Sequence, residues 1–306
     1  MSNRLAISAI ETVAAGQHGV FSEEQARACG VSPHMLWHHT RRGRRWRLTA
    51  ARVYEVAEQP GDWRRPLMAA ALSLGDAGRV SHRSAGQLLR LDGVRPGPPE
   101  VIVARGRTNP EWRLHRRAAL PPDLTTTDGI PHTTPTRTLR DLCSVLDEDH
   151  LEMALESALR LGYMTLDDFE RLAATAGWKG VTRLRAVLDR RPPGAPATGS
   201  ELETRFVQLV RVLGLPDPER QYAVVLNGEV VALLDLCWPD AGLFVELDGG
   251  THEELVALRR DRQRQNDVVR LLGWRPLRFT WTDVVERPTV TGRIVRQAHL
   301  PRASAF

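Results

Sequence analysis

Two short apolar runs in the C-terminal third of the chain carry acidic residues where a strand would normally be apolar. Asp235 lies in the run 230–236, and Glu246 and Asp248 lie in the run 243–248. Side chains alternate between the faces of a strand, so Glu246 and Asp248 share one face. Carboxylates beside apolar surface are costly unless they are paired, and neither run contains a basic residue. A bound divalent cation would remove this cost, and Mg²⁺ prefers carboxylate oxygens and water.

This pattern resembles the restriction-endonuclease-like fold, in which an Asp and a Glu on successive strands hold a catalytic metal and a Lys follows. In this chain Asp248 stands at the position of that Lys. The region 198–292 resembles uncharacterised proteins similar to the very-short-patch mismatch-repair endonuclease. The matching residues are Glu246-Leu247-Asp248-Gly249, His252, Asp261-Arg262-Gln263-Arg264-Gln265-Asn266 and Gly273-Trp274-Arg275-Pro276-Leu277-Arg278-Phe279.

The resemblance implies a role for each matching side chain. Asp235, Glu246 and Asp248 would hold Mg²⁺ or Mn²⁺, and His252 would assist the attacking water. Glu203 would be an accessory acid on the preceding helix. The arginines expected to brace the DNA backbone are Arg262 and Arg264.

Each of these residues also has a structural interpretation. Ser200 and Glu203 fit a capping box at a helix start, and both roles are compatible. Asp248 is suited to begin the Asp-Gly turn, and His252 is suited to the surface. The arginines around Asp261 are equally typical of a solvated helix face.

The N-terminal residues 1–57 predict a winged helix-turn-helix. Ser32-Pro33 is a typical helix start, and Gly43 ends the helix that follows. A basic hairpin comes next, and this layout places a helix in the major groove of duplex DNA. We expect Met35 and Trp37 in the core. The side chains expected to face DNA are His34, His38, Arg41, Arg42, Arg45 and Arg47.

A second resemblance covers about residues 5–190. The segments Gly16–Tyr54, Ser81-His82-Arg83-Ser84-Ala85 and Asp128–Leu139 look like those of AbiEi-type antitoxins from type IV toxin–antitoxin systems. Arg52 stands where that family commonly has Gly in the wing. The resemblance implies a nucleotidyltransferase-like toxin as a partner.

The predicted organisation is a multi-domain α/β protein. A winged helix at 1–57 precedes a mixed α/β domain at 62–190. A Pro- and Gly-rich linker follows at 191–199, and an endonuclease-like domain occupies 200–292.

The bulk composition suits a globular protein, and its modest positive charge is consistent with nucleic-acid binding without indicating it. The formal net charge is +5, and Lys179 is the lone lysine among 42 basic residues. The three cysteines are far apart, which favours a reducing cytoplasm. No run approaches the length of a membrane-spanning helix, and no signal peptide is expected.

Two functional hypotheses follow. The first is a metal-dependent DNA endonuclease, directed by its winged helix and acting in phage or mobile-DNA defence. The second is an AbiEi-type antitoxin or transcriptional regulator whose nuclease fold is catalytically silent, which the absence of the usual lysine favours.

Overall fold

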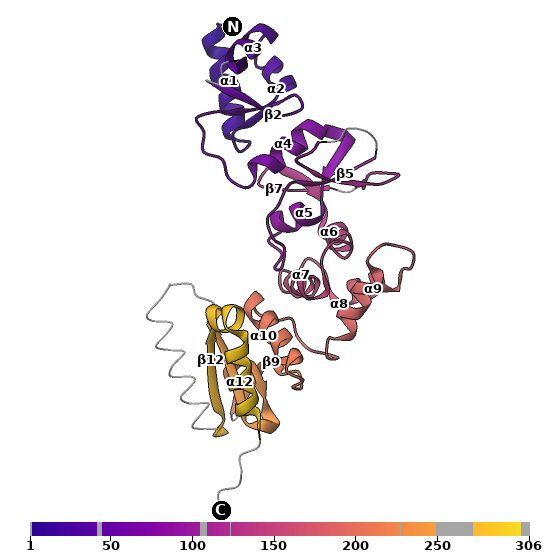
Figure 1. Ribbon diagram of the computed structural model, residues 1–306, viewed down its shortest axis with the longest axis vertical. Coiled ribbons are helices and arrows are strands. Elements are labelled where there is room, and N and C mark those ends of the chain that lie inside the picture. Colours follow the sequence, from indigo (N-terminus) through magenta and orange to yellow (C-terminus); the bar gives the residue numbers. More distant parts are fainter. Residues whose placement is uncertain are drawn as a thin grey trace, which may run out of the picture. The chain divides into compact units, whose positions relative to one another are not determined.

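The computed structural model divides into two compact units, Met1–Val145 and Leu146–Phe306 (Figure 1). In the part of the chain that the structure describes, helices combine with three separate sheets, which confirms the multi-domain α/β class. The residues that the structure describes are 2–41, 45–104, 109–122, 124–226, 228–248 and 272–300.

The first part of unit 1 combines three helices with a small sheet of strand order β1-β3-β2. Ser32 caps the third helix by accepting the Met35 amide at 3.2 Å, as its Ser-Pro start predicts. Trp46 is fully buried and shares a core with Ile10 and Leu36. The elements are α1 (Asn3–Ala15), β1 (Val20–Ser22), α2 (Glu23–Ala28), α3 (Pro33–Arg41), β2 (Trp46–Ala50) and β3 (Val53–Val56).

The turn between β2 and β3 contains Arg52 in the left-handed conformation, with φ of 61°. A side chain with a Cβ atom adopts this conformation at a cost of roughly 1–2 kcal/mol. The Arg52 guanidinium lies 3.1 Å from the Glu23 carboxylate, an ion pair that a glycine at this position could not form. The hairpin therefore closes without the glycine that the antitoxin family commonly has.

The second part of unit 1 is a mixed sheet of strand order β6-β5-β4-β8-β7. Leu67 from α4 packs with Val101 and Ile130 from the sheet, and this contact forms the core. The elements are α4 (Arg65–Leu74), β4 (Gly78–Val80), α5 (His82–Leu88), β5 (Glu100–Val103), β6 (Arg113–Arg116), β7 (Leu124–Thr127), β8 (Ile130–Thr133) and α6 (Pro135–Leu142).

Unit 2 begins with helices and continues into a sheet of strand order β12-β11-β10-β9. The β9–β10 and β10–β11 pairs are antiparallel, whereas β11 and β12 are parallel. Phe206 from α10 packs with Val245 and Phe279 from the sheet. The elements are α7 (Glu148–Arg160), α8 (Leu166–Ala174), α9 (Val181–Asp189), α10 (Glu201–Val212), β9 (Glu219–Leu226), β10 (Glu229–Trp238), β11 (Leu243–Asp248), β12 (Arg275–Thr280) and α12 (Pro288–His299).

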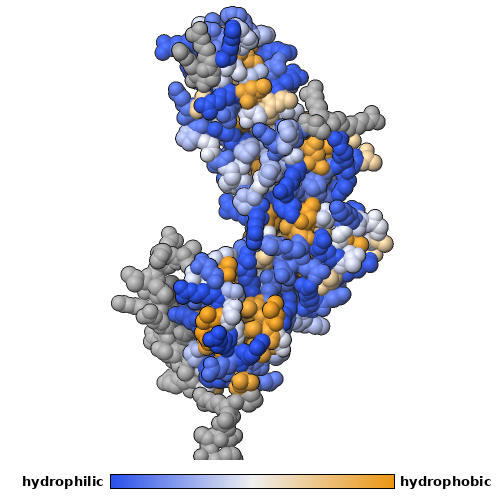
Figure 2. Space-filling model, viewed as in Figure 1, coloured by the Kyte–Doolittle hydropathy of each residue, from blue (hydrophilic) through white to orange (hydrophobic). Residues whose placement is uncertain are grey.

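The boundary between the units lies inside the region that the sequence assigns to one middle domain, 62–190. Helices α7, α8 and α9 belong to unit 2, together with the endonuclease-like region. Among the described helices, none is both long and apolar enough to cross a membrane. Figure 2 shows a largely hydrophilic face with apolar residues in separate patches.

A buried carboxylate fixes the segment expected to be a linker, 191–199. Glu156 on α7 is 1% exposed and accepts hydrogen bonds from Arg220 at 2.8 Å and from the Thr198 amide at 3.1 Å. Arg191 donates to the same carboxylate. A buried charge is stable only when it is paired and hydrogen-bonded, so this segment packs within unit 2 rather than hanging free.

We expect Glu156→Gln to lower the free energy of unfolding by about 3 kcal/mol, because two buried guanidinium groups lose their negative partner. Urea titration followed by tryptophan fluorescence measures the loss. The control is Glu148→Gln, which removes an exposed pair with Arg190 and should change stability by less than about 0.5 kcal/mol. Equal losses for the two variants would contradict the assignment.

Candidate acidic site and nucleic-acid interface

Asp235 lies where the ladder between β10 and β11 ends. The last paired residues are Leu236 and Val245, so Asp235 and Glu246 are the next residues along the two strands. The Asp235 carboxylate accepts a hydrogen bond from the backbone amide of Leu247 at 3.1 Å. The side chain therefore takes the acceptor position that a backbone carbonyl holds in a regular ladder. The two acids expected on neighbouring strands are adjacent at this point.

Glu203 approaches this point from the first turn of α10 and is only 5% exposed. Its carboxylate accepts hydrogen bonds from the Gly199 amide at 2.6 Å, the Gln221 side chain at 3.1 Å and the Ser200 hydroxyl at 3.2 Å. Ser200 in turn caps the Glu203 amide. Burial raises the pKa of Glu203, and the negative charge of Asp235 raises it further. Ser200 thus caps the helix as expected, but the Glu203 carboxylate accepts from the Gly199 amide rather than from the Ser200 amide of a capping box. Glu203 also lies within electrostatic range of Asp235.

Gly199 lies directly against the Glu203 carboxylate. A Cβ atom at this position would lie 2.7 Å from the Glu203 carboxylate, which is closer than such atoms pack. Gln221, a further donor that lies on β9, has a left-handed backbone with φ of 50°. Strained backbone of this kind is retained where the surrounding contacts fix it, and it clusters at functional sites.

Arg278 on β12 was not identified from the sequence as a site residue. Glu246 pairs with Arg278 in the parallel β11–β12 ladder, and their side chains approach to 3.5 Å. The Arg278 guanidinium also lies 3.4 Å from the Asp248 carboxylate. The sequence contains one indication of this role, the charged residue in the otherwise apolar run Leu277-Arg278-Phe279. The sequence does not indicate the strand order that brings Arg278 next to Glu246.

The structure thus brings Glu203 close to Asp235 and places Asp235 beside Glu246 on the neighbouring strand. Glu246 and Asp248 share Arg278 as their ion-pair partner. Three other residues expected at this site, His252, Arg262 and Arg264, lie outside the described residues. The described part of the chain holds one set of three potential ligands with atoms all within 4.8 Å of one another, and it lies in unit 1.

That set is His82, Glu100 and His115, and the sequence did not predict it. His115 lies 3.0 Å from the Glu100 carboxylate, and Arg83 donates to the same carboxylate at 3.0 Å. Burial alone would raise the pKa of Glu100, but these hydrogen bonds outweigh it and hold the pKa below its ordinary value. Burial, together with the nearby charge of His115, lowers the pKa of His82 to about 2. By distance alone, the three side chains could hold a metal ion.

The orientation of the two rings does not fit a metal centre, and Glu100 pairs with Arg83 and His115 instead. The rings of His82 and His115 are stacked, with centroids 3.4 Å apart and planes 9° apart. A metal lies near the plane of each imidazole that binds it, so two stacked rings cannot share one ion unless one of them turns. Imidazole also suits zinc, copper, iron or nickel, whereas magnesium prefers oxygen. This cluster therefore does not support the expected Mg²⁺ site.

The exposed face of α3 carries His34, Trp37, His38 and Arg41, at the spacing of one helical stripe. Met35 is buried as expected. The expectation that Trp37 lies in the core was wrong, because its side chain is 54% exposed. Arg41 stacks over the Trp37 ring, with its guanidinium carbon 4.8 Å from the ring centroid.

The arginines of the wing differ in their contacts. Both carboxylate oxygens of Glu11 accept hydrogen bonds from Arg45, at 2.6 and 2.7 Å. Arg45 is thus held in an ion pair, and this engagement raises its pKa further. Arg47 is 60% exposed and lies 3.9 Å from Glu55. Arg42 lies outside the described residues. The wing therefore offers Arg47 as the freer cation of the two.

Comparison with known proteins gives a distant match. No protein-family model matches the chain. Two uncharacterised proteins of Mycobacterium tuberculosis, from strains CDC 1551 and H37Rv, are 29% identical to it over 174 residues. The match covers 56% of this chain and 62% of each relative.

We expect the Glu203→Gln variant to gain stability relative to wild type as pH rises. An acid whose folded-state pKa is raised binds its proton more tightly when folded, so folding is favoured less once pH exceeds the ordinary value of 4.5. The difference grows through the raised pKa and then levels off. Urea midpoints across this pH range measure it, with Glu201→Gln, a half-buried acid paired with Arg205 on the same helix, as the control. If the stability difference between Glu203→Gln and wild type shrinks as pH rises, the pKa of Glu203 is not raised in the folded protein.

Proposed function

We propose that the chain is a DNA-binding protein whose C-terminal acidic site uses Mg²⁺ to hydrolyse phosphodiester bonds. The observation that carries the proposal is the buried Glu203 carboxylate, whose hydrogen-bond donors are neutral and which lies near Asp235. A second negative charge beside a buried carboxylate makes that carboxylate costlier to ionise, and a divalent cation offsets this cost. The distant mycobacterial relatives are uncharacterised and add nothing to this choice.

The donor set fits a hard cation that takes oxygen ligands. Asp235 and Glu246 would hold it, with Asp248 and Glu203 close by. When bound, Mg²⁺ would polarise a phosphate and make a coordinated water more acidic. Arg278 keeps Glu246 and Asp248 together and supplies positive charge beside them, where a phosphate would lie. By resemblance to the very-short-patch repair endonuclease group, His252 would accept the proton of the attacking water.

Incubation of supercoiled plasmid with the full chain and Mg²⁺ or Mn²⁺ tests the proposal. We expect nicked or linear product with wild type, and at least a roughly hundredfold slower rate with Asp235→Asn or Glu246→Ala, because both would remove ligands. Glu201→Gln changes a half-buried acid that pairs with Arg205 on the same helix, outside the proposed ligand set, and should cleave like wild type. Equal cleavage by wild type and Asp235→Asn would indicate a contaminating nuclease and refute the assignment.

A second function is favoured by one specific observation. Asp248 occupies the position of the usual lysine, and Arg278 is engaged by both Glu246 and Asp248. Such a site can be silent, and the chain would then act as an AbiEi-type antitoxin or transcriptional regulator. Its partners would be duplex DNA and a nucleotidyltransferase-like toxin. This function is supported if the protein binds duplex DNA but leaves plasmid intact at every metal concentration.

A further inference from the structure

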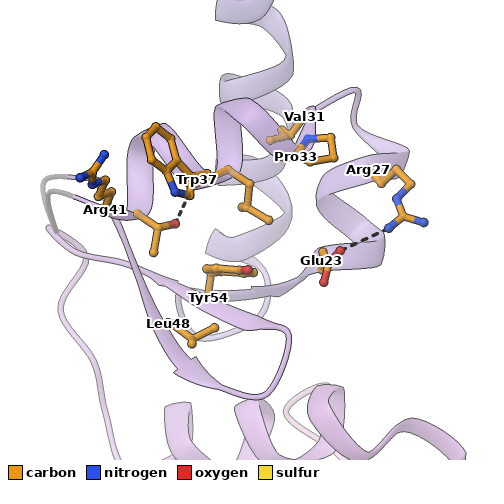
Figure 3. A pocket seen from close by; sticks show the side chains of 10 residues that line it. Glu23, Arg27, Val31, Pro33, Trp37, Arg41, Leu48 and Tyr54 are labelled. Atoms are coloured by element: carbon orange, nitrogen blue, oxygen red, sulfur yellow. Dashed lines mark hydrogen bonds and ion pairs between the residues drawn. The ribbon is translucent and has the colours of Figure 1, made fainter.

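A groove of about 430 Å³ opens between α3 and the β2–β3 hairpin in unit 1. Its surface is mainly apolar, and Figure 3 shows Trp37 above Leu48 and Tyr54. Trp37 is 54% exposed and Leu48 is 60% exposed. Large apolar side chains exposed side by side are unusual unless they contact a partner.

The charges around the groove favour an anionic partner. Glu23, the carboxylate in the lining, lies 3.3 Å from Arg27 and 3.1 Å from Arg52, so its charge is compensated. Arg41 stacks over Trp37 at one end of the groove. The groove therefore combines apolar walls with a cationic border. This combination suits a polyanion that presents apolar groups between its phosphates.

The position of Trp37 indicates which chemical group of the DNA would occupy the groove. It lies on the same exposed stripe of α3 as His34, His38 and Arg41, which is the stripe that would face the base pairs if α3 enters the major groove. The apolar group on the major-groove edge of the base pairs is the 5-methyl group of thymine. Tryptophan offers a broad apolar surface to such a group and has no side-chain acceptor for a hydrogen bond from a base.

We propose that this groove recognises the 5-methyl group of thymine in duplex DNA, with Trp37 and Leu48 as its specificity-determining contacts. The inference rests on the DNA binding proposed above and adds a preference for methyl-bearing bases. It does not depend on the acidic site of unit 2. Protein or small-molecule occupants of the groove are the rival outcomes of the test.

The test compares two pools of short random duplexes that differ only in thymine or uracil, which lacks the methyl group. Each unlabelled pool competes with a fluorescent thymine duplex for the full chain, and anisotropy reports the affinity. We expect the thymine pool to bind at least about three times more tightly than the uracil pool, because burying one methyl group strengthens binding by roughly this factor. Equal affinity of wild type for both pools, with binding intact, overturns the proposal.

Variants separate methyl recognition from general binding. Trp37→Ala and Leu48→Thr change exposed side chains and should bring the ratio of the two affinities close to one. Arg47→Ala should weaken both pools alike and leave the ratio unchanged, because phosphate contacts carry no base information. A ratio that persists in Trp37→Ala and Leu48→Thr overturns the proposal and points to another occupant of the groove. Failure of wild type to bind either pool would instead refute the DNA binding itself.

Discussion

The cost of burying carboxylates governs how both units are built. In unit 1, Glu100 is nearly inaccessible and is held by Arg83 and His115. In unit 2, Glu156 is held by Arg220 and Arg191, and it fixes the chain between the helices and the sheet. Arginine suits this task because its planar group donates several hydrogen bonds at once.

Glu203 is the contrasting case. It is also buried, but the donors that the structure places on it are a backbone amide, a hydroxyl and a side-chain amide. It lies within electrostatic range of Asp235, at the point where the β10–β11 ladder ends. Arginine pairs with the buried acids elsewhere, whereas the donors on Glu203 are neutral and the negative charge of Asp235 raises its pKa. This difference is the reason for proposing a metal at this site and not at the His82 cluster.

Local features were predictable from the sequence, and long-range ones were not. The Ser32-Pro33 helix start and the neighbouring strands of Asp235 and Glu246 follow from capping and alternation. The approach of Arg278 depends on a parallel strand pair, whose order no local pattern encodes. Likewise, residues 191–199 read as a loose linker because their partner, Glu156, lies more than 30 residues earlier.

Trp37 shows a different limit. An apolar residue on an amphipathic helix normally indicates the buried face, and on that basis it was assigned to the core. In the structure, Met35 and Leu36 fill the core, and Trp37 belongs to the opposite stripe with His34, His38 and Arg41. Periodicity identifies the stripe of a helix that faces the core. The apolar character of a single residue does not show whether that residue lies on this stripe or on the exposed one.

The most direct test of the central claim is a Mn²⁺ titration of the full chain, followed by electron paramagnetic resonance of the free ion. Mn²⁺ suits carboxylate and water ligands, as Mg²⁺ does, so it reports on the acidic site, and His115→Ala is the control at the other cluster. The account predicts binding by wild type, loss of binding in Asp235→Asn, and retention in His115→Ala. Absence of binding by wild type, or loss of binding in His115→Ala but not in Asp235→Asn, would contradict it.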